Sequence, residues 1–414
     1  MERSYARPAG HWDFPIHVSH KPGVRSGEMI FVGGQVDLDP RGNVRNPGDL
    51  ETQTRNVMEN IQSVLAEFGA GLEDVVKLVA FYVNDGSLDE AAFLGDVGAA
   101  FGKGPGPAVT AVPVAVLGYP EVVVEIEAVA MLGEDGARLP KTRAAANGHS
   151  PLPEPFVHGV SCGEMIFVAG QAGRDASGRV LHGHDIVRQS EVVMDNLERV
   201  LAELGAGFDD VVKMNRYYVG RGRQADWEPA AKIVAARFAE PGPAATGIPL
   251  PRLWPDGEMV RVEAVAMRGE DGSRLPRRHV WPEGHWDWPI HLPYKHGLKC
   301  GDMIFVGGQV ALTPEGTVID PGDVEAQART SLENIRRVLN EFGATVDDVV
   351  KVNAFYKGIG TAEDLHRNLK IRSAAFTEPG PATTGIPLPC LAYEDLMIEI
   401  EVVAMAPWGV PLGP

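Results

Sequence analysis

The sequence predicts an α+β fold that is repeated three times in one chain. The segment MIFVGGQ at residues 29–35 returns as MIFVAGQ at 165–171 and as MIFVGGQ at 303–309. The glutamines that end these segments lie 136 and 138 residues apart, about a third of the 414-residue chain each time. A repeat of this length sets the number of domains before any other pattern is considered. We therefore expect three modules, at residues 1–137, 138–275 and 276–414.

The order of the elements is the same in each module, and the first copy shows it. Apolar and polar residues alternate between residues 16 and 44 around turns with Pro and Gly, which predicts two or three strands. Asp49 is the expected N-cap of a helix with an apolar stripe over residues 57–68 and Gly69 at its end. A strand near 75–83, a helix near 88–101 and two final strands complete the unit. Each module is expected to be a mixed β-sheet covered on one face by two helices.

The last strand, VEIEAVA at residues 124–130, predicts how the modules meet. Side chains alternate between the faces of a strand, so Glu125 and Glu127 share one face and Val124 and Ile126 share the other. If the helices cover the apolar face, a sister module is the natural cover for the carboxylates. The similar linkers at residues 131–140 and 267–276 can each span roughly 30 Å, at about 3.3 Å per residue. Three modules can then close into an intramolecular pseudo-trimer.

Composition and missing motifs limit the class of partner. The chain has 38 basic and 56 acidic residues and a formal charge of -18, which argues against nucleic acid and favours a small molecule. It has no apolar run of membrane-spanning length, no visible signal peptide and only three cysteines, so we expect a cytoplasmic protein without a membrane partner. No HExxH, paired CxxC or phosphate-binding glycine motif is present, so no metal and no cofactor are expected.

The succession of motifs resembles the RidA family, also called YjgF/YER057c/UK114. The first copy carries GEMIFVGGQ, DVVKLVAFYV, GPA and VEIEAVAM, and the other copies repeat them in this order with few changes. The resemblance implies a chorismate-mutase-like fold in each module and sites in the clefts between modules. It also implies hydrolysis of enamines or imines to ketones and ammonia without a metal or cofactor.

The resemblance also places the site residues of the family. Its deaminases carry an arginine after the Pro-Ala of the penultimate strand, where it can hold a substrate carboxylate. All three copies lack this arginine; the matching residues are Val109, Ala245 and Thr383. The carboxylate of the family's last strand falls on Glu125 and Glu399, and Arg261 replaces it in the second copy. The family's tyrosine matches Tyr294, whereas the other copies have His20 and Phe156.

Each charged candidate has a functional and a structural interpretation. Glu125 and Glu399 act as general acid or base if a cleft desolvates them, or they are hydrogen-bond or ion-pair partners across modules. Arg261 holds an anionic group of the substrate, or it neutralises a glutamate of a neighbouring module. A third set, Glu127, Glu263 and Glu401, recurs in every copy and therefore fits a shared structural role.

Three further sets are candidates for substrate binding. The hydroxyls of Thr110, Thr246 and Thr384 can bind an oxyanion or belong to ordinary strand packing. The glycines of the first repeat motif, Gly34, Gly170 and Gly308, allow close approach of a ligand or of another strand. A polar role in the cleft and a structural hydrogen bond are both open for Asn215 and Asn353.

An aromatic motif lies near the start of the first and third modules and is absent from the second. It reads GHWDFPIH at residues 10–17 and GHWDWPIH at 284–291, and its Trp and Pro content predicts an arm that packs across a neighbouring module. Two functions are compatible with the sequence. The first is a cofactor-free hydrolase or deaminase for a small imine, enamine or related C–N substrate, with divergent specificity because the usual arginine is absent. The alternative is a non-catalytic protein that binds carboxylates or aromatic acids.

Overall fold

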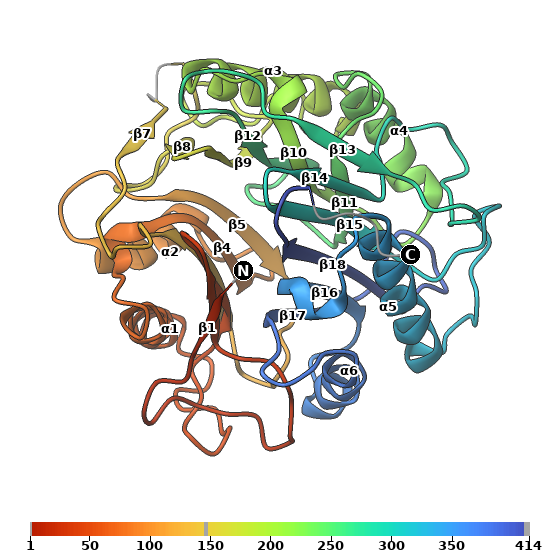
Figure 1. The fold of residues 1–414 in the computed structure, drawn as a ribbon. Coiled ribbons are helices and arrows are strands. Elements are labelled where there is room, and N and C mark those ends of the chain that lie inside the picture. Colours follow the sequence, from red (N-terminus) through yellow and green to blue (C-terminus); the bar gives the residue numbers. More distant parts are fainter. Residues whose placement is uncertain (1, 145–147, 410–414) are drawn as a thin grey trace.

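The computed structural model describes residues 2–144 and 148–409 and contains one six-stranded sheet for each repeat (Figure 1). The strand orders are β1-β2-β3-β6-β4-β5, β11-β10-β12-β9-β8-β7 and β13-β14-β15-β18-β16-β17. Each sheet falls within one of the three predicted modules, here called modules 1, 2 and 3. The predicted α+β class and the three-fold repeat are confirmed.

Module 1 shows how the local sequence forms the unit. Asp49 caps the first helix by accepting a hydrogen bond from the backbone of Thr52, and Gly69 has a φ of +74° just after that helix, as expected. Strands β4 and β5, which precede and follow α2 in the sequence, pair in parallel. All other neighbouring strands of this sheet pair antiparallel. The bounds are β1 (Arg3–Ala6), β2 (Gly23–Ser26), β3 (Met29–Gln35), α1 (Leu50–Ala66), β4 (Val75–Val83), α2 (Glu90–Gly98), β5 (Ala108–Val114) and β6 (Val124–Met131).

Modules 2 and 3 repeat this order. Module 2 consists of β7 (Lys141–Arg143), β8 (Gly159–Cys162), β9 (Met165–Ala172), α3 (Ile186–Glu203), β10 (Val211–Val219), α4 (Gln224–Ala235), β11 (Ala244–Leu250) and β12 (Val260–Met267). Module 3 consists of β13 (Arg277–Val280), β14 (Gly297–Cys300), β15 (Met303–Gln309), α5 (Val324–Glu341), β16 (Val349–Lys357), α6 (Ala362–Ala374), β17 (Ala382–Leu388) and β18 (Ile398–Met405). The short first strands β1, β7 and β13 were not predicted, because three or four residues carry too little alternation.

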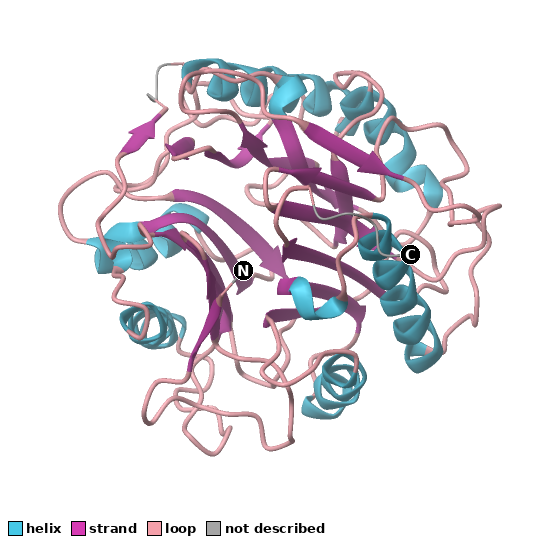
Figure 2. Ribbon diagram, viewed as in Figure 1, coloured by secondary structure: helices cyan, strands magenta, loops and turns pink. Residues whose placement is uncertain are grey.

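The helices form the rim of the molecule and the sheets face its centre (Figure 2). Strand β3 lies beside β17, β5 lies beside β9, and β11 lies beside β15, so each sheet contacts the next in one cyclic order. Gly33 shows how close this approach is. A Cβ at Gly33 would lie 2.6 Å from the carbonyl oxygen of Thr383 in module 3. The predicted pseudo-trimer is confirmed, and no room for a side chain remains at Gly33 where β3 lies beside β17.

Apolar residues of all three modules meet at the centre of the molecule. Phe31, Phe167 and Phe305 occupy the same position in the three repeats and belong to one buried cluster. Cys162 and Cys300, the last residues of β8 and β14, also belong to this cluster. Within residues 2–144 and 148–409, no helix is long and apolar enough to cross a lipid bilayer.

Candidate active sites between the modules

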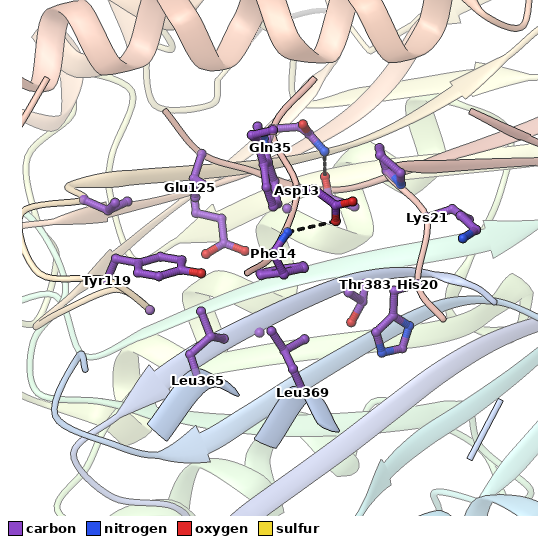
Figure 3. Close-up of a pocket in the computed structure, with 18 residues that line it drawn as sticks. Asp13, Phe14, His20, Lys21, Gln35, Tyr119, Glu125, Leu365, Leu369 and Thr383 are labelled. Atoms are coloured by element: carbon purple, nitrogen blue, oxygen red, sulfur yellow. Dashed lines mark hydrogen bonds between the residues drawn. The ribbon is translucent and has the colours of Figure 1, made fainter. Parts of the chain in front are cut away.

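Three equivalent clefts lie where one module meets the next. Cleft A joins modules 1 and 3, cleft B joins modules 3 and 2, and cleft C joins modules 2 and 1. In cleft A a cavity of about 60 Å³ lies between Glu125 and Tyr119 of module 1 and Leu365 and Leu369 of α6. Figure 3 shows Glu125 and Tyr119 in this space, opposite the two leucines.

Glu125 reaches cleft A from β6 and is 7% exposed. Its carboxylate lies directly over Gly34, where any side chain would overlap it. Gly34 is therefore needed to make room for the carboxylate. The backbone N–H of Gly385 in module 3 faces the same group from the opposite wall.

The surroundings of Glu125 favour its neutral form. Burial raises the pKa of Glu125 to about 8, although the positive charge of Lys351 opposes this shift. A carboxyl group with this pKa is mainly protonated at neutral pH and can donate a proton. It can also accept one back without a large change in free energy, which suits a general acid and base.

The side walls of cleft A are partly polar. His20 lines the cavity, and burial, together with the charge of Arg372, lowers its pKa to about 3, so its ring is neutral. The hydroxyl of Tyr119 lies 2.9 Å from Nε2 of His366 on α6, and burial raises the pKa of Tyr119 to about 12. His20 and Tyr119 are therefore both neutral at neutral pH.

The aromatic arm of module 1 forms one wall of cleft A. Trp12 and Phe14 line the cavity, with their rings 5.1 Å apart and edge to face. The chain that follows crosses to module 3, where Ser19 donates its hydroxyl to the Ser373 carbonyl at 2.9 Å and Lys21 pairs with Glu378 at 2.9 Å. The structure thus places this arm across a neighbouring module, as the sequence predicted.

Cleft B repeats this arrangement with more aromatic side chains. Glu399 of β18 is 7% exposed, lies over Gly308 and faces the backbone N–H of Gly247. Burial and the charge of Glu401 raise the pKa of Glu399 to about 8. The cavity has a volume of about 70 Å³. Its aromatic lining comes from modules 2 and 3 and comprises Tyr218, Trp227, Trp286, Trp288, Tyr294 and Tyr393.

Cleft C differs because Arg261 stands where the other clefts have a glutamate. Its guanidinium binds both carboxylate oxygens of Glu90 in module 1, each at 3.0 Å, and pairs with Glu258 at 2.8 Å. Arg174 contacts the same two glutamates at 3.2 and 2.6 Å. Although burial opposes the charge, Glu258 and Glu90 hold the pKa of Arg261 above its usual value. Of the two roles considered for Arg261, these contacts support neutralisation of a neighbouring module's glutamate.

Two buried arginines at the open clefts were not predicted from the sequence; one lines cleft B and the other lies behind the wall of cleft A. Arg372 of α6 donates Nε to Asn368 at 2.6 Å and Nη1 to Thr383 at 2.7 Å, where Thr383 lines cleft A. Arg216 of β10 lines cleft B, 5.3 Å from the ring of Tyr218. Burial lowers the pKa of Arg372 to about 10, so it stays charged at neutral pH. A signal for Arg372 existed, because Leu365, Leu369 and Arg372 share one face of a helix.

The remaining substrate-binding candidates are used between modules. The Thr384, Thr110 and Thr246 hydroxyls accept hydrogen bonds from the N–H groups of Gly34, Gly170 and Gly308 in the next module, at 3.0, 2.9 and 3.0 Å. Phe156 is buried against Phe101 of module 1, with ring centroids 5.9 Å apart. These contacts favour the structural interpretation of the threonines. The bonded glycine N–H groups are not available to a ligand.

Asn215 and Asn353 lie away from the clefts, in a cavity of about 80 Å³ at the centre. Their amides donate to Glu401 at 3.1 Å and to Glu127 at 3.3 Å, which supports the structural hydrogen bond considered for them. The recurrent glutamates each pair with a lysine of another module, and the pairs are Lys77–Glu263 at 2.7 Å, Lys213–Glu401 at 2.8 Å and Lys351–Glu127 at 2.8 Å. Their shared structural role agrees with the sequence analysis.

Comparison with known proteins identifies the family. A family model described as Endoribonuclease L-PSP matches residues 16–132, 148–268 and 289–406. The chain belongs to this family, which is the RidA family. A RutC family protein of Pyrococcus abyssi is 36% identical over 112 residues, which is 27% of this chain and 85% of that protein. The 2-iminobutanoate/2-iminopropanoate deaminase of Escherichia coli is 34% identical over 116 residues, which is 27% of this chain and 87% of that protein.

One solved structure matches most of this chain rather than a single module. The crystal structure of a chorismatase matches 80% of this chain and 93% of its own chain, with a TM-score of 0.52 and 16% sequence identity. At this identity the similarity concerns the fold alone. It agrees with an arrangement in which the RidA modules are joined in one chain.

Proposed function

We propose that this RidA family member is a cofactor-free hydrolase that acts on a small imine, enamine or related C–N substrate in clefts A and B. The observation that carries the proposal is a buried glutamate in each of these clefts, Glu125 or Glu399, with its pKa raised to about 8. The deaminase activity in the name of the Escherichia coli relative supports the same reaction class.

The proposed chemistry needs one group that both donates and accepts a proton. The protonated glutamate donates its proton to the imine nitrogen, or to the β-carbon of an enamine, which makes the substrate carbon electrophilic. The resulting carboxylate then takes a proton from water as the water oxygen bonds to that carbon. The glutamate then gives this proton to the amine nitrogen, and the C–N bond breaks while the carboxylate takes the hydroxyl proton of the intermediate. Ammonia and a ketone leave, and the glutamate is again protonated. A pKa near the working pH makes both directions of transfer accessible.

The clefts favour small substrates with a specificity of their own. Cavities of about 60 and 70 Å³ hold only a few water-sized groups, since one water needs about 10–15 Å³. The usual arginine position carries Val109, Ala245 and Thr383, so contacts to the substrate must differ from those of the deaminases. Cleft C is left out of the proposal because Arg261 replaces the glutamate.

Substitution of the two glutamates tests the proposal. Ammonia release from a panel of small imines and enamines is measured for the wild type, Glu125→Gln, Glu399→Gln and the double variant. Each single variant should keep the activity of the other cleft, and the double variant should lose about 10²-fold or more. Glu315→Gln, on an exposed turn, is the matched control. A double variant as active as the wild type would contradict the proposal.

A non-catalytic binding protein is the second candidate. The absence of the family arginine from all three strand positions favours it. Carboxylates and aromatic acids would then raise the melting temperature of the protein, while no member of the imine panel would be turned over. Turnover that depends on Glu125 and Glu399 rejects this candidate.

A further inference from the structure

A buried arginine lies at or directly beside each of the three clefts, and each arginine comes from a different element. Arg216 lines cleft B and Arg261 crosses cleft C, whereas Arg372 lies directly behind Thr383 and Gly385 in the wall of cleft A. Arg372 lies on helix α6, Arg216 on strand β10 and Arg261 on strand β12. Their relative exposures are 0%, 7% and 4%. Three unrelated positions that supply the same group to equivalent clefts indicate a shared requirement for positive charge.

The three guanidinium groups lie against the same point of the penultimate strand. Gly385, Gly247 and Ala111 are equivalent there, because they pair in register with Ala354, Arg216 and Ala80. Arg372 Nη2 lies 2.8 Å from the place of a Cβ on Gly385, and Arg216 Nη2 lies 3.5 Å from that of Gly247. Arg261 Nη1 donates to the carbonyl of Ala111 at 2.5 Å.

Cleft C shows what an arginine at this point binds. The Glu90 carboxylate makes a bidentate contact with the Arg261 guanidinium, and both N···O distances are 3.0 Å. The hydroxyl of Tyr82 donates to the same carboxylate at 2.9 Å. Arginine and tyrosine together form a carboxylate-binding pair, and the protein's own glutamate occupies it.

Each open cleft has a buried arginine and a buried tyrosine without the glutamate that holds them in cleft C, although the tyrosine of cleft B, Tyr294, is not the counterpart of Tyr82. Behind the wall of cleft A, Nη2 of Arg372 and the hydroxyl of Tyr356, the counterpart of Tyr82, are buried without a hydrogen-bond partner among the described residues. In cleft B, the same holds within residues 2–144 and 148–409 for Nε of Arg216 and the hydroxyl of Tyr294. A buried donor without a partner is unfavourable, so these groups suit a ligand that supplies acceptor oxygens.

We propose that Arg372 at cleft A and Arg216 in cleft B are the anion-binding residues of their clefts, and that they select a ligand with a carboxylate. This carboxylate takes the place that Glu90 takes in cleft C. The identification of this ligand as a substrate rests on the proposed function. The binding of a carboxylate at these arginines is independent of it. The carboxyl groups of Glu125 and Glu399 are mainly protonated at neutral pH, so they do not repel it.

Calorimetric titration with propionate and with the neutral isostere propionamide tests the proposal on the full chain. The wild type should bind propionate at two sites, and propionamide should bind at least tenfold more weakly. Arg372→Met and Arg216→Met should each leave one site, and the double variant none. Arg188→Met, on the exposed face of α3, is the control and should keep two sites. Equal binding of the two probes, or two sites in the double variant, would overturn the proposal.

Glu90→Ala tests the comparison with cleft C and does not remove either arginine of the open clefts. It should expose Arg261 and Tyr82, so that propionate binds at a third site and raises the melting temperature more than in the wild type. An unchanged stoichiometry would overturn the assignment of Glu90 as an internal carboxylate. If Arg372→Met does not fold, Arg372→Lys replaces it as the test. Lysine keeps the positive charge but cannot make the bidentate contact of a guanidinium, so this variant should bind propionate more weakly in cleft A.

The binding and turnover results separate this inference from the proposed function. Propionate binding that depends on the arginines, without ammonia release from any imine, supports the inference and counts against the proposed function. Ammonia release without a preference for carboxylates supports the proposed function and overturns the inference.

Discussion

One residue on the last strand distinguishes the open clefts from the closed one. Glu125 and Glu399 leave a cavity beside them, whereas Arg261 at the equivalent position extends across the interface to Glu90. The sequence predicted that all three side chains face another module, because residues alternate along a strand. It did not predict Glu90 as the partner of Arg261, since the two residues are 171 positions apart.

The raised pKa of Glu125 and Glu399 should appear in the stability of the protein. Each pKa is about 8 in the folded state and near 4.5 in the unfolded state, so the folded protein binds more protons between these values. Their contribution is fully present below about pH 4.5 and is lost as the pH rises through about 8. The slope is at most about 1.4 kcal/mol per pH unit for each carboxyl.

Urea unfolding at pH 5, 6.5, 8 and 9 measures this contribution. The free energy of unfolding of the wild type should fall with pH relative to that of the Glu125→Gln/Glu399→Gln variant, and the difference should level off above about pH 8. Two parallel curves across this range would show that the carboxyl groups titrate normally.

At the scale of elements, strands of different modules are joined by single side chains. Thr384 of β17 accepts a hydrogen bond from Gly34 of β3 at 3.0 Å and donates one to Glu127 of β6 at 2.6 Å. Its hydroxyl therefore connects the glycine that lies under Glu125 with the central glutamate. The sequence left open whether this threonine binds an oxyanion or belongs to strand packing, because its partners depend on how the sheets meet.

Replacement of Thr384 should weaken the contact between modules 1 and 3. Thr384→Val removes the hydroxyl and leaves the Gly34 N–H without its partner, which should destabilise the protein by about 1–3 kcal/mol. Thr384→Ser keeps the hydroxyl and should cost less. Chemical denaturation compares both variants with Thr317→Val, whose residue is exposed. Equal stability of the valine and serine variants would contradict the role of the hydroxyl.

At the scale of the molecule, three modules form one structural unit. The central apolar cluster contains residues of all three, and a ring of Lys–Glu pairs links each module to the next. The aromatic arms add to this asymmetrically. They are present at clefts A and B, which keep a glutamate, and the motif is absent from the module that supplies Arg261 to cleft C.

This shared core predicts one cooperative unfolding transition. Removing one module would expose apolar surface of the other two, so the modules should unfold together. Urea unfolding followed by far-UV circular dichroism and by tryptophan fluorescence should give coincident curves. Separate transitions for the two signals would indicate modules that unfold independently.

The sequence by itself determined the three modules, their order of elements and the face of the glutamates, because repeats, helix caps and strand alternation are local patterns. Only the tertiary structure decided which side chains share a cleft. Arg216 and Arg372 belong to different modules from the glutamates Glu399 of module 3 and Glu125 of module 1 that they approach. Such proximity depends on how the sheets close into a ring, and a pattern along one strand or helix carries no information about its partner across that ring.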